Sequence, residues 1–543
     1  MAARDVTAQV ILALDERRSF LVDAGAGAGK TYTLVQALRH LLTKRRSNLE
    51  STAGRIACIT YTNVAKDEIR ERVGADPLVT IATIHDFLWA EIKRFQGELR
   101  KAIIARNSEA DTPQDLEALT PNIPIRYVQL GRALDEGRIS HDDVLALSHR
   151  LISEHPKLAR IFADRFPYIL VDEYQDTSPL IIEVLLDHLA KAGNPRCSVG
   201  LFGDSMQQIY PTGVGEILGY PDLERITKDE NRRSSQPVID VLNAIRPSLK
   251  QWPAGVPRDG EVHLFLQRQV PKERRLDSAL DKLEALGWSR ETAKRLYLTH
   301  RLIARDLDYS NLQEAYRKAK RTESLQDGTD PLARQILDIE LLCTAFETRD
   351  HRTLASLLSA KSTRITKHQD KERISQALEQ VTTSRITMPI GEVFDQAHEN
   401  GLLRKSRELI ARERLISATS LDTRTQRKAD LARTVLALPY SEAVAYSMFK
   451  TEQTPLATQH GVKGAEFDDV IVVIDDKAWT MYSMDELLAD PFGNTDRIIR
   501  TKKLFYVSCS RARNRLAVVF LSDLSPEAER TAQEWFKVGK VYQ

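Results

Sequence analysis

The chain has 543 residues, which at about 150 residues per domain predicts three or four domains. Hydrophobic residues make up 42% and charged residues 28%, a balance that excludes a disordered, collagen-like or coiled-coil chain. The 78 lysines and arginines against 76 acidic residues leave a formal charge of +2, which excludes a histone-like polycation and is still compatible with a local basic track for nucleic acid.

Short runs of β-branched and aliphatic residues alternate with charged helical stretches. Such alternation is typical of a parallel sheet covered by helices on both faces. The first series of predicted strands is 20–23, 56–60, 79–83, 168–171 and 198–202, and the second is 262–266, 295–299, 470–474 and 516–520. The two series predict two α/β domains in one chain.

Two charged stretches with apolar residues at helical spacing interrupt these series. We interpret them as mainly helical insertions, one in each α/β domain. The predicted parts are 1–90 with 160–245 for the first α/β domain, 90–160 for its insertion, 246–305 with 440–543 for the second α/β domain, and 306–440 for its insertion.

The segment FLVDAGAGAGKTYTLV at 20–35 reads as a strand, a glycine-rich loop and a helix. This order predicts a cradle for the phosphates of ATP, because backbone N–H groups converge at the helix N-terminus while Lys30 reaches the β- and γ-phosphates and Thr31 offers a hydroxyl to Mg²⁺. Ala24 stands where the strict motif has glycine, which the cradle tolerates if φ is negative there. The cradle comprises Ala24, Gly25, Ala26, Gly27, Ala28, Gly29, Lys30 and Thr31.

A nucleoside triphosphatase also needs carboxylates at the end of a neighbouring strand. The segment YILVDEYQD at 168–176 supplies two of them after an apolar run. We expect Asp172 to hold Mg²⁺ and Glu173 to orient and deprotonate the attacking water.

With DEYQDTS at 172–178 the chain resembles superfamily 1 DNA helicases of the UvrD/Rep/PcrA type. Further segments resemble the motifs of that family in the same order: TYTNVAKDEIRERV at 60–73, TIATIHDF at 80–87, HDDVL at 141–145, GDSMQQIY at 203–210, ENRRSS at 230–235, LYLTHRLIA at 296–304, TQHGVKGAEF at 458–467 and LFYVSCSRARNRL at 504–516. The resemblance implies two RecA-like P-loop domains with an ATP-hydrolysing cleft between them.

The resemblance also implies roles for single residues. In the catalytic set of Lys30, Glu173, Gln207, Arg233 and Arg511, Gln207 senses the γ-phosphate, Arg233 binds it and Arg511 is the arginine finger. Around the nucleoside, Gln9 reads adenine, Tyr32 and Arg232 flank it, and Glu466 bonds the ribose. The implied DNA contacts are Tyr61, Thr62, Asn63, Thr83, His85, His460 and Lys463.

Two positions depart from the family pattern. The family usually has arginine after GKT and tyrosine before the arginine of the second-domain motif, whereas this chain has Tyr32 and Arg232, an exchange that keeps one aromatic and one guanidinium plane. Where the family stacks an aromatic on a DNA base, this chain has Thr212. We therefore expect single-stranded DNA to bind more weakly, or another aromatic residue to supply the stacking contact. The candidates are Tyr61, Phe87 and Trp89, and the alternative for each of them is packing in the core.

The leading hypothesis is an ATP-dependent translocase or helicase that moves 3′ to 5′ on single-stranded or partly duplex DNA. A second is a DNA-stimulated ATPase that senses DNA and regulates a partner nuclease, since the chain also resembles in size and motif style the helicase subunit of Gabija-type antiphage systems, which works beside an OLD-family nuclease. A third, a P-loop kinase or another ATPase without nucleic acid, leaves 60–73, His85 and 458–467 unexplained.

No apolar run reaches the roughly 18 to 20 residues that a membrane span needs, so no membrane partner is expected and a cytoplasmic location is predicted. Four scattered cysteines indicate free, buried thiols rather than disulfides or a metal site.

Overall fold

The computed structural model describes residues 5–128, 131–192, 197–360, 367–418, 422–476 and 480–543. It divides into two compact units, one formed by residues 1–279 with 462–543 and the other by residues 280–461.

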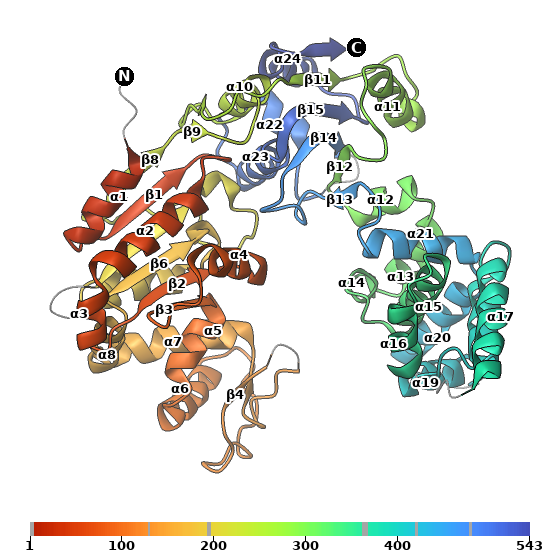
Figure 1. Ribbon diagram of the computed structural model, residues 1–543, viewed down its shortest axis with the longest axis horizontal. Coiled ribbons are helices and arrows are strands. Elements are labelled where there is room, and N and C mark those ends of the chain that lie inside the picture. The colour runs from red at the N-terminus through yellow and green to blue at the C-terminus, as the bar shows by residue number, and fades with distance from the viewer. Residues whose placement is uncertain (1–4, 129–130, 193–196, 361–366, 419–421, 477–479) are drawn as a thin grey trace. The chain divides into compact units, whose positions relative to one another are not determined.

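The first sheet has six parallel strands in the order β3-β2-β6-β7-β1-β8 (Figure 1). Its strands are β1 (Phe20–Ala24), β2 (Ile56–Thr60), β3 (Val79–Thr83), β6 (Tyr168–Asp172), β7 (Ser198–Gly203) and β8 (Glu224–Lys228). In the pairing of β1 with β7, Val22 lies opposite Phe202, and in the pairing of β6 with β7, Asp172 lies opposite the same Phe202. The carboxyl ends of β1, β6 and β7 therefore meet at one edge of the sheet.

Successive residues of these strands contribute side chains to two different hydrophobic cores. Val22 and Leu170 pack with the helices α1 (Val6–Asp15) and α2 (Lys30–Lys44). Leu21 and Ile169 pack on the opposite face with the helices α5 (Ile84–Ile92), α7 (His141–Glu154) and α8 (Pro156–Arg165). Side chains alternate across a strand, so a run of consecutive apolar residues fills both faces.

Further short helices complete the first α/β part and extend into the predicted insertion. They are α3 (Arg46–Ser51), α4 (Asn63–Val73), α6 (Gln96–Ser108) and α9 (Pro179–Glu183), and a two-stranded ribbon joins β4 (Arg126–Tyr127) to β5 (Arg138–Ile139). Asp143, which caps α7 together with Ser140, accepts bonds from Arg106 at 3.0 Å and Arg132 at 2.7 Å. One buried carboxylate thus ties α6, α7 and the loop between the short strands together.

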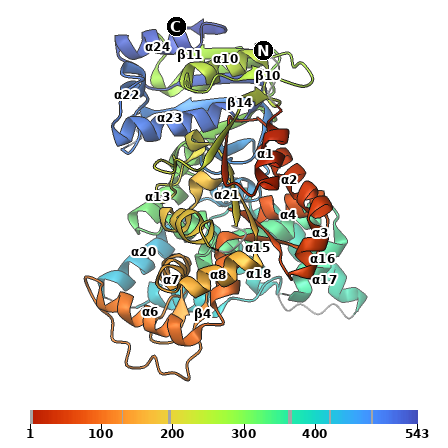
Figure 2. The ribbon, with the colours of Figure 1, turned by 90° about the vertical axis from the view of Figure 1, so that its left-hand side faces the viewer.

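The second sheet has six strands in the order β13-β12-β14-β15-β11-β16. Its strands are β11 (Glu261–Phe265), β12 (Lys294–Tyr297), β13 (Leu456–Thr458), β14 (Phe467–Ile474), β15 (Ala512–Phe520) and β16 (Lys540–Tyr542). Figure 2 shows α22 (Met484–Ala489), α23 (Asp496–Cys509) and α24 (Pro526–Trp535) beside β11 and β14, and α10 (Gln236–Ile245) packs on β11 and β15. A small ribbon pairs β9 (Glu230–Asn231) with β10 (Trp252–Pro253). The prediction of two α/β domains with parallel sheets is confirmed.

The unit of residues 280–461 is mainly helical. Its helices are α12 (His300–Asp306), α13 (Ser310–Lys318), α14 (Thr322–Gln326), α15 (Pro331–Glu347), α16 (His351–Ala360), α17 (His368–Ser384), α18 (Ile390–Glu399), α19 (Arg407–Ile416), α20 (Thr423–Leu436) and α21 (Tyr440–Lys450). Asp330 is fully buried at the start of α15 and accepts bonds from Tyr316 of α13 at 3.0 Å and Arg412 of α19 at 3.2 Å. This carboxylate joins three helices.

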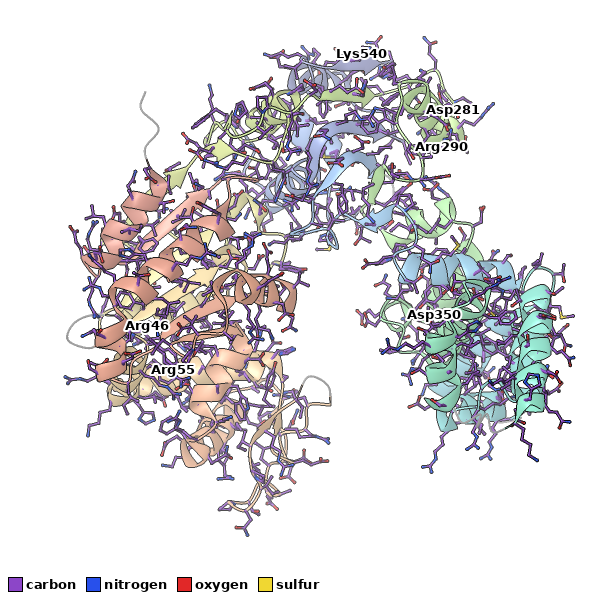
Figure 3. The ribbon with its side chains drawn as sticks, in the orientation of Figure 1. Arg46, Arg55, Asp281, Arg290, Asp350 and Lys540 are labelled. Atoms are coloured by element: carbon purple, nitrogen blue, oxygen red, sulfur yellow. The ribbon has the colours of Figure 1, made fainter. Side chains whose placement is uncertain are left out.

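Near the start of the helical unit, Arg290 folds back onto α11 (Arg275–Ala285), where it pairs with Asp281 and, at 3.0 Å, with Glu284 (Figure 3). The four cysteines are free and buried, as predicted. None of the described helices is long and apolar enough to cross a membrane.

Candidate functional site

The glycine-rich loop joins the end of β1 to the start of α2. Gly27 and Gly29 adopt φ values of 70° and 77°, a left-handed conformation that favours glycine, and Gly29 caps α2. Ala24 is the last residue of β1 and has extended backbone, so its side chain is compatible with the loop. Lys30 and Thr31 are the first residues of α2, where the positive end of the helix dipole favours an anion.

Two carboxylates lie beside this loop at the end of β6. The Lys30 Nζ atom is 4.0 Å from Glu173 Oε1, and Glu173 has φ 52° and ψ 46°. Burial and the negative charge of Glu173 raise the pKa of Asp172. Burial opposes ionisation of Glu173 as well, but the charges of Lys30 and Lys463 outweigh it and lower the pKa of that carboxyl. Glu173 therefore ionises more readily than Asp172.

Thr31 and Asp172 provide a hydroxyl and a carboxylate, which are oxygen ligands that suit Mg²⁺. The described residues contain no group of three or more histidine, cysteine, aspartate or glutamate side chains that could hold a metal ion alone. A cation here would thus share its coordination with phosphate and water, as Mg²⁺ does in nucleotide sites.

A chain of side-chain contacts connects Gln207 to Arg511. Gln207 Nε2 donates to Asp204 Oδ2 at 2.8 Å, and Arg511 donates to Gln207 Oε1 at 3.3 Å. Arg511 is 1% exposed and also donates to Ala465 O at 3.1 Å and Val507 O at 3.0 Å. Burial lowers the pKa of Arg511 to about 9. An anion that approached the guanidinium group would therefore offset the cost of burying its charge.

Arg233 and Glu466 are bonded directly. Arg233 Nε donates to Glu466 Oε2 at 2.5 Å and Arg233 Nη1 donates to Ser510 O at 3.2 Å, while Arg513 Nε donates to Glu466 Oε1 at 3.0 Å. Burial disfavours the Glu466 carboxylate, but its bonds to the two arginines prevail and lower its pKa. The structure therefore brings Arg233 next to Ser510 and Arg511.

The residues expected around adenine lie on separate elements. Gln9 is half-buried on α1, and Tyr32 is 58% exposed on α2. Arg232 is exposed and pairs with Glu230 at 2.8 Å, while its backbone N–H donates to Gly27 O at 2.9 Å. Arg232 is thus attached to the glycine-rich loop by its backbone.

Among the expected DNA contacts, Tyr61 stacks on Tyr210 with ring centroids 5.5 Å apart. Lys463 Nζ lies 5.7 Å from the Tyr210 centroid, pairs with Asp176 and donates to Gln207 O at 2.8 Å. The structure therefore places Lys463 between the carboxylate segment and Gln207.

Three other expected DNA contacts have structural roles at helix starts. Thr62 and Thr83 cap α4 and α5, and Asn63 accepts a bond from Lys66 at 2.8 Å. His85 lies 4.6 Å from His141 between ring centroids, and burial lowers its pKa.

His460 lies in the unit of residues 280–461, where burial lowers its pKa. Of the stacking candidates, Phe87 is 2% exposed and packs edge-on against Phe166, so it belongs to the core. Trp89 is half-buried and lies 6.3 Å from Tyr127 between ring centroids.

Sequence reasoning missed several residues around the loop. Arg246 is 4% exposed and bonds Asp204 at 2.8 Å and Asp23 at 3.2 Å. The sequence could have indicated Arg246, because an arginine at the end of an apolar helix is buried and then needs a buried acidic partner. Tyr506 and Gln251 also contact the loop, at Ala26. Tyr506 lies within the motif at 504–516 but was assigned no role, and no motif contains Gln251.

Two family models match the chain, an AAA domain at residues 8–213 and a UvrD-like helicase C-terminal domain at residues 126–523. The second match covers most of the chain.

The curated relatives include a match over nearly the whole chain and matches over parts of it. Gabija protein GajB of Bacillus cereus (strain HuB5-5) is 25% identical over 675 aligned positions, which span 97% of this chain and 96% of that protein. ATP-dependent DNA helicase PcrA of Leuconostoc citreum is 26% identical over 59% of this chain and 49% of its own length. DNA helicase II of Escherichia coli (strain K12) is 24% identical over 45% of this chain and 41% of its own length. The chain thus spans less than half of these two helicases.

Proposed function

Because the chain belongs to the family of UvrD-like helicases, we propose that it hydrolyses ATP and uses the energy to move 3′ to 5′ on single-stranded or partly duplex DNA. The observation that carries this proposal is the meeting of Lys30, Glu173, Gln207 and Arg511 within one compact unit, where Lys30 Nζ is 4.0 Å from Glu173 Oε1. These are the groups that phosphoryl transfer to water requires.

In this proposal the glycine-rich loop and Lys30 bind the β- and γ-phosphates, and Thr31 and Asp172 hold Mg²⁺. Mg²⁺ held there would neutralise phosphate charge. Glu173, whose pKa the nearby lysines lower, would accept a hydrogen bond and then a proton from the attacking water. Arg511, together with Arg233, compensates the charge that develops on the γ-phosphate.

Gln9, Tyr32 and Arg232 would bind the adenine, and Glu466 the ribose. Since Arg233 and Arg513 both bond Glu466, ribose binding would draw this carboxylate away from two guanidinium groups. Arg233 would then be released toward phosphate.

The two α/β domains, with insertions at 90–160 and 306–440, would grip DNA alternately. The proposed contacts are Tyr61, Thr62, Asn63, Thr83, His85, His460 and Lys463. Lys463 supports the coupling of DNA to nucleotide, because it bonds both Asp176 and the backbone of Gln207. A cytoplasmic location suits this function, since both ATP and DNA are present there.

A second function is a DNA-stimulated ATPase that regulates a nuclease partner of the OLD family in antiphage defence. The full-length similarity to the Gabija protein GajB supports it. Thr212 supports it too, since Tyr210 is stacked on Tyr61 and no aromatic follows it at residue 212. Each lost stacking platform weakens single-strand binding by about 1–3 kcal/mol.

Two assays at one fixed salt concentration test the proposal. Phosphate release is measured with and without single-stranded DNA, and strand displacement is measured on duplexes with a 3′ or a 5′ tail. Stimulation by DNA with displacement of 3′-tailed duplexes supports the motor. Stimulation without displacement, unless copurified proteins are added, supports the regulator, and ATPase activity indifferent to DNA refutes both.

A further inference from the structure

We infer that Gln251 is a positioning residue of the nucleotide site, which sets the orientation of the phosphate-binding amides from a distant segment of the chain. The inference rests on the proposed function, because it concerns how the loop at 24–31 binds a nucleotide.

Both polar groups of Ala26 are held by side chains from far along the sequence. Gln251 Nε2 donates to Ala26 O at 2.9 Å, and Asn231 Nδ2 donates to the same oxygen at 3.0 Å. The Ala26 N–H donates to the hydroxyl of Tyr506 at 3.2 Å. Gln251 is 5% exposed, so this is a buried contact that excludes water.

The backbone of Gln251 is itself fixed by one side chain of α10. The Gln251 N–H donates to Asn243 Oδ1 at 2.7 Å, and Asn243 Nδ2 donates to Gln251 O at 2.8 Å. With its main chain held on both sides, the side chain of Gln251 has a defined direction toward Ala26.

Holding the Ala26 carbonyl determines where the next N–H points. In a planar trans peptide the C=O of one residue and the N–H of the next point in opposite directions. Bonds from Gln251 and Asn231 to Ala26 O therefore turn the Gly27 N–H away from them. The bond from the Arg232 N–H to Gly27 O fixes the next peptide of the loop in the same manner, and the Ala28 N–H of that peptide donates to Gly25 O at 3.2 Å.

This restraint matters because glycine permits the loop to change conformation. Gly27 has φ 70°, and rotation of the neighbouring peptides costs little free energy when the residue between them is glycine. Amides that are already oriented bind phosphate with less loss of conformational freedom. Removal of the Gln251 amide should therefore weaken nucleotide binding more than the chemical step.

The identity of residue 25 provides an independent observation. A Cβ built on Gly25 would lie 2.3 Å from Gln251 Nε2 and 2.4 Å from its Cδ. Gly25 is absent from the residues with positive φ, so the Gln251 side chain, and not the backbone, excludes a methyl group there. Gly25 and Gln251 are thus complementary in shape, and substitutions at the two positions should be coupled.

The test measures the affinity of the full chain for a fluorescent ATP analogue with Mg²⁺, together with kcat and KM for ATP. Gln251→Ala should weaken affinity and raise KM about three- to tenfold, the range expected for one neutral hydrogen bond, and leave kcat within twofold. Gln251→Glu should weaken affinity further, because a carboxylate would face the Ala26 carbonyl. Gln453→Ala, an exposed glutamine of the other compact unit, is the matched control.

The coupling test adds Gly25→Ala. Alone, it should weaken the affinity more than tenfold, whereas in the Gln251→Ala background it should add little. Melting curves without nucleotide identify any variant that fails to fold, and Gln251→Glu remains informative if Gly25→Ala is one of them.

Wild-type affinity in both Gln251→Ala and Gln251→Glu would overturn the inference and leave the proposed function intact. Equal losses from Gly25→Ala in both backgrounds would overturn the shape complementarity. A wild-type chain that binds no nucleotide would refute the proposed function, and the inference with it.

Discussion

The buried pair of Asp176 and Lys463 should make the stability of the chain depend on pH. Burial raises the pKa of Asp176 from 3.8 to about 6, although Lys463 opposes the rise. The folded chain therefore binds this proton more tightly than the unfolded chain does. Protonation of Asp176 stabilises the fold, fully below about pH 4, and this stabilisation is lost as the pH rises through about 6.

The size of the effect follows from these two pKa values. Between pH 5 and pH 7, linkage predicts that the free energy of unfolding falls by about 1.3 kcal/mol through Asp176 alone. If the larger compact unit, about 360 residues, unfolds cooperatively, this corresponds to a fall in melting temperature of about 2 °C.

The assay is thermal melting in metal-free buffer at pH 5, 6 and 7. The melting temperature of the wild type should fall by about 2 °C more over this range than that of Asp176→Asn, which has no proton to lose. Asp222→Asn, which removes an exposed carboxylate, should follow the wild type. Lys463→Met should raise the pKa of Asp176 further and move the fall to higher pH. Parallel curves for the wild type and Asp176→Asn would refute the reasoning.

Three further outcomes are expected. Glu173→Gln should bind ATP but release phosphate at least about a hundredfold more slowly, because an amide cannot take the proton of water; wild-type turnover would disprove its role as the base. Phe166→Ala should lower the free energy of unfolding by about 3–5 kcal/mol, since the ring is buried against Phe87, with Phe166→Leu as a milder control in urea denaturation. Tyr32→Ala and Arg232→Ala should each raise KM for ATP, and the exchange of Tyr32→Arg with Arg232→Tyr should restore much of the loss; strict additivity would show that the two side chains share no base.

The sheets could be predicted from sequence because their central strands are buried on both faces. The apolar run 168–171 became β6, in which all five residues are buried. The edge strands β8, β13 and β16 were missed, since β8 is half exposed, with the sequence ERITK, and β13 and β16 have only three residues each. An edge strand pairs on one side alone and can be short or carry polar residues, which weakens the apolar signal. The edge strand β3 was predicted because its sequence, VTIAT, keeps β-branched residues.

Those residues of the candidate site that lie in a short motif could be predicted from the sequence. Residues that contact the site from far along the chain could not. The loop, Asp172 and Glu173 are recognisable from short segments, and the structure brings them together. Gln251 contacts Ala26 across 225 residues of sequence, and a single glutamine in a connecting segment has no periodicity or spacing that reveals such a partner.

The left-handed backbone of Glu173 has a consequence for any effort to stabilise this chain. A side chain with a Cβ at φ 52° and ψ 46° destabilises the fold by about 1–2 kcal/mol relative to glycine, which adopts this conformation freely. The charges of Lys30 and Lys463 act in the opposite direction, because they stabilise the ionised carboxylate in the fold. Glu173→Gly would therefore relieve backbone strain and at the same time lose these attractions. A library screened only by heating would thus select on strain and charge together at this residue, whereas a screen for cleavage of ATP would retain the strained carboxylate.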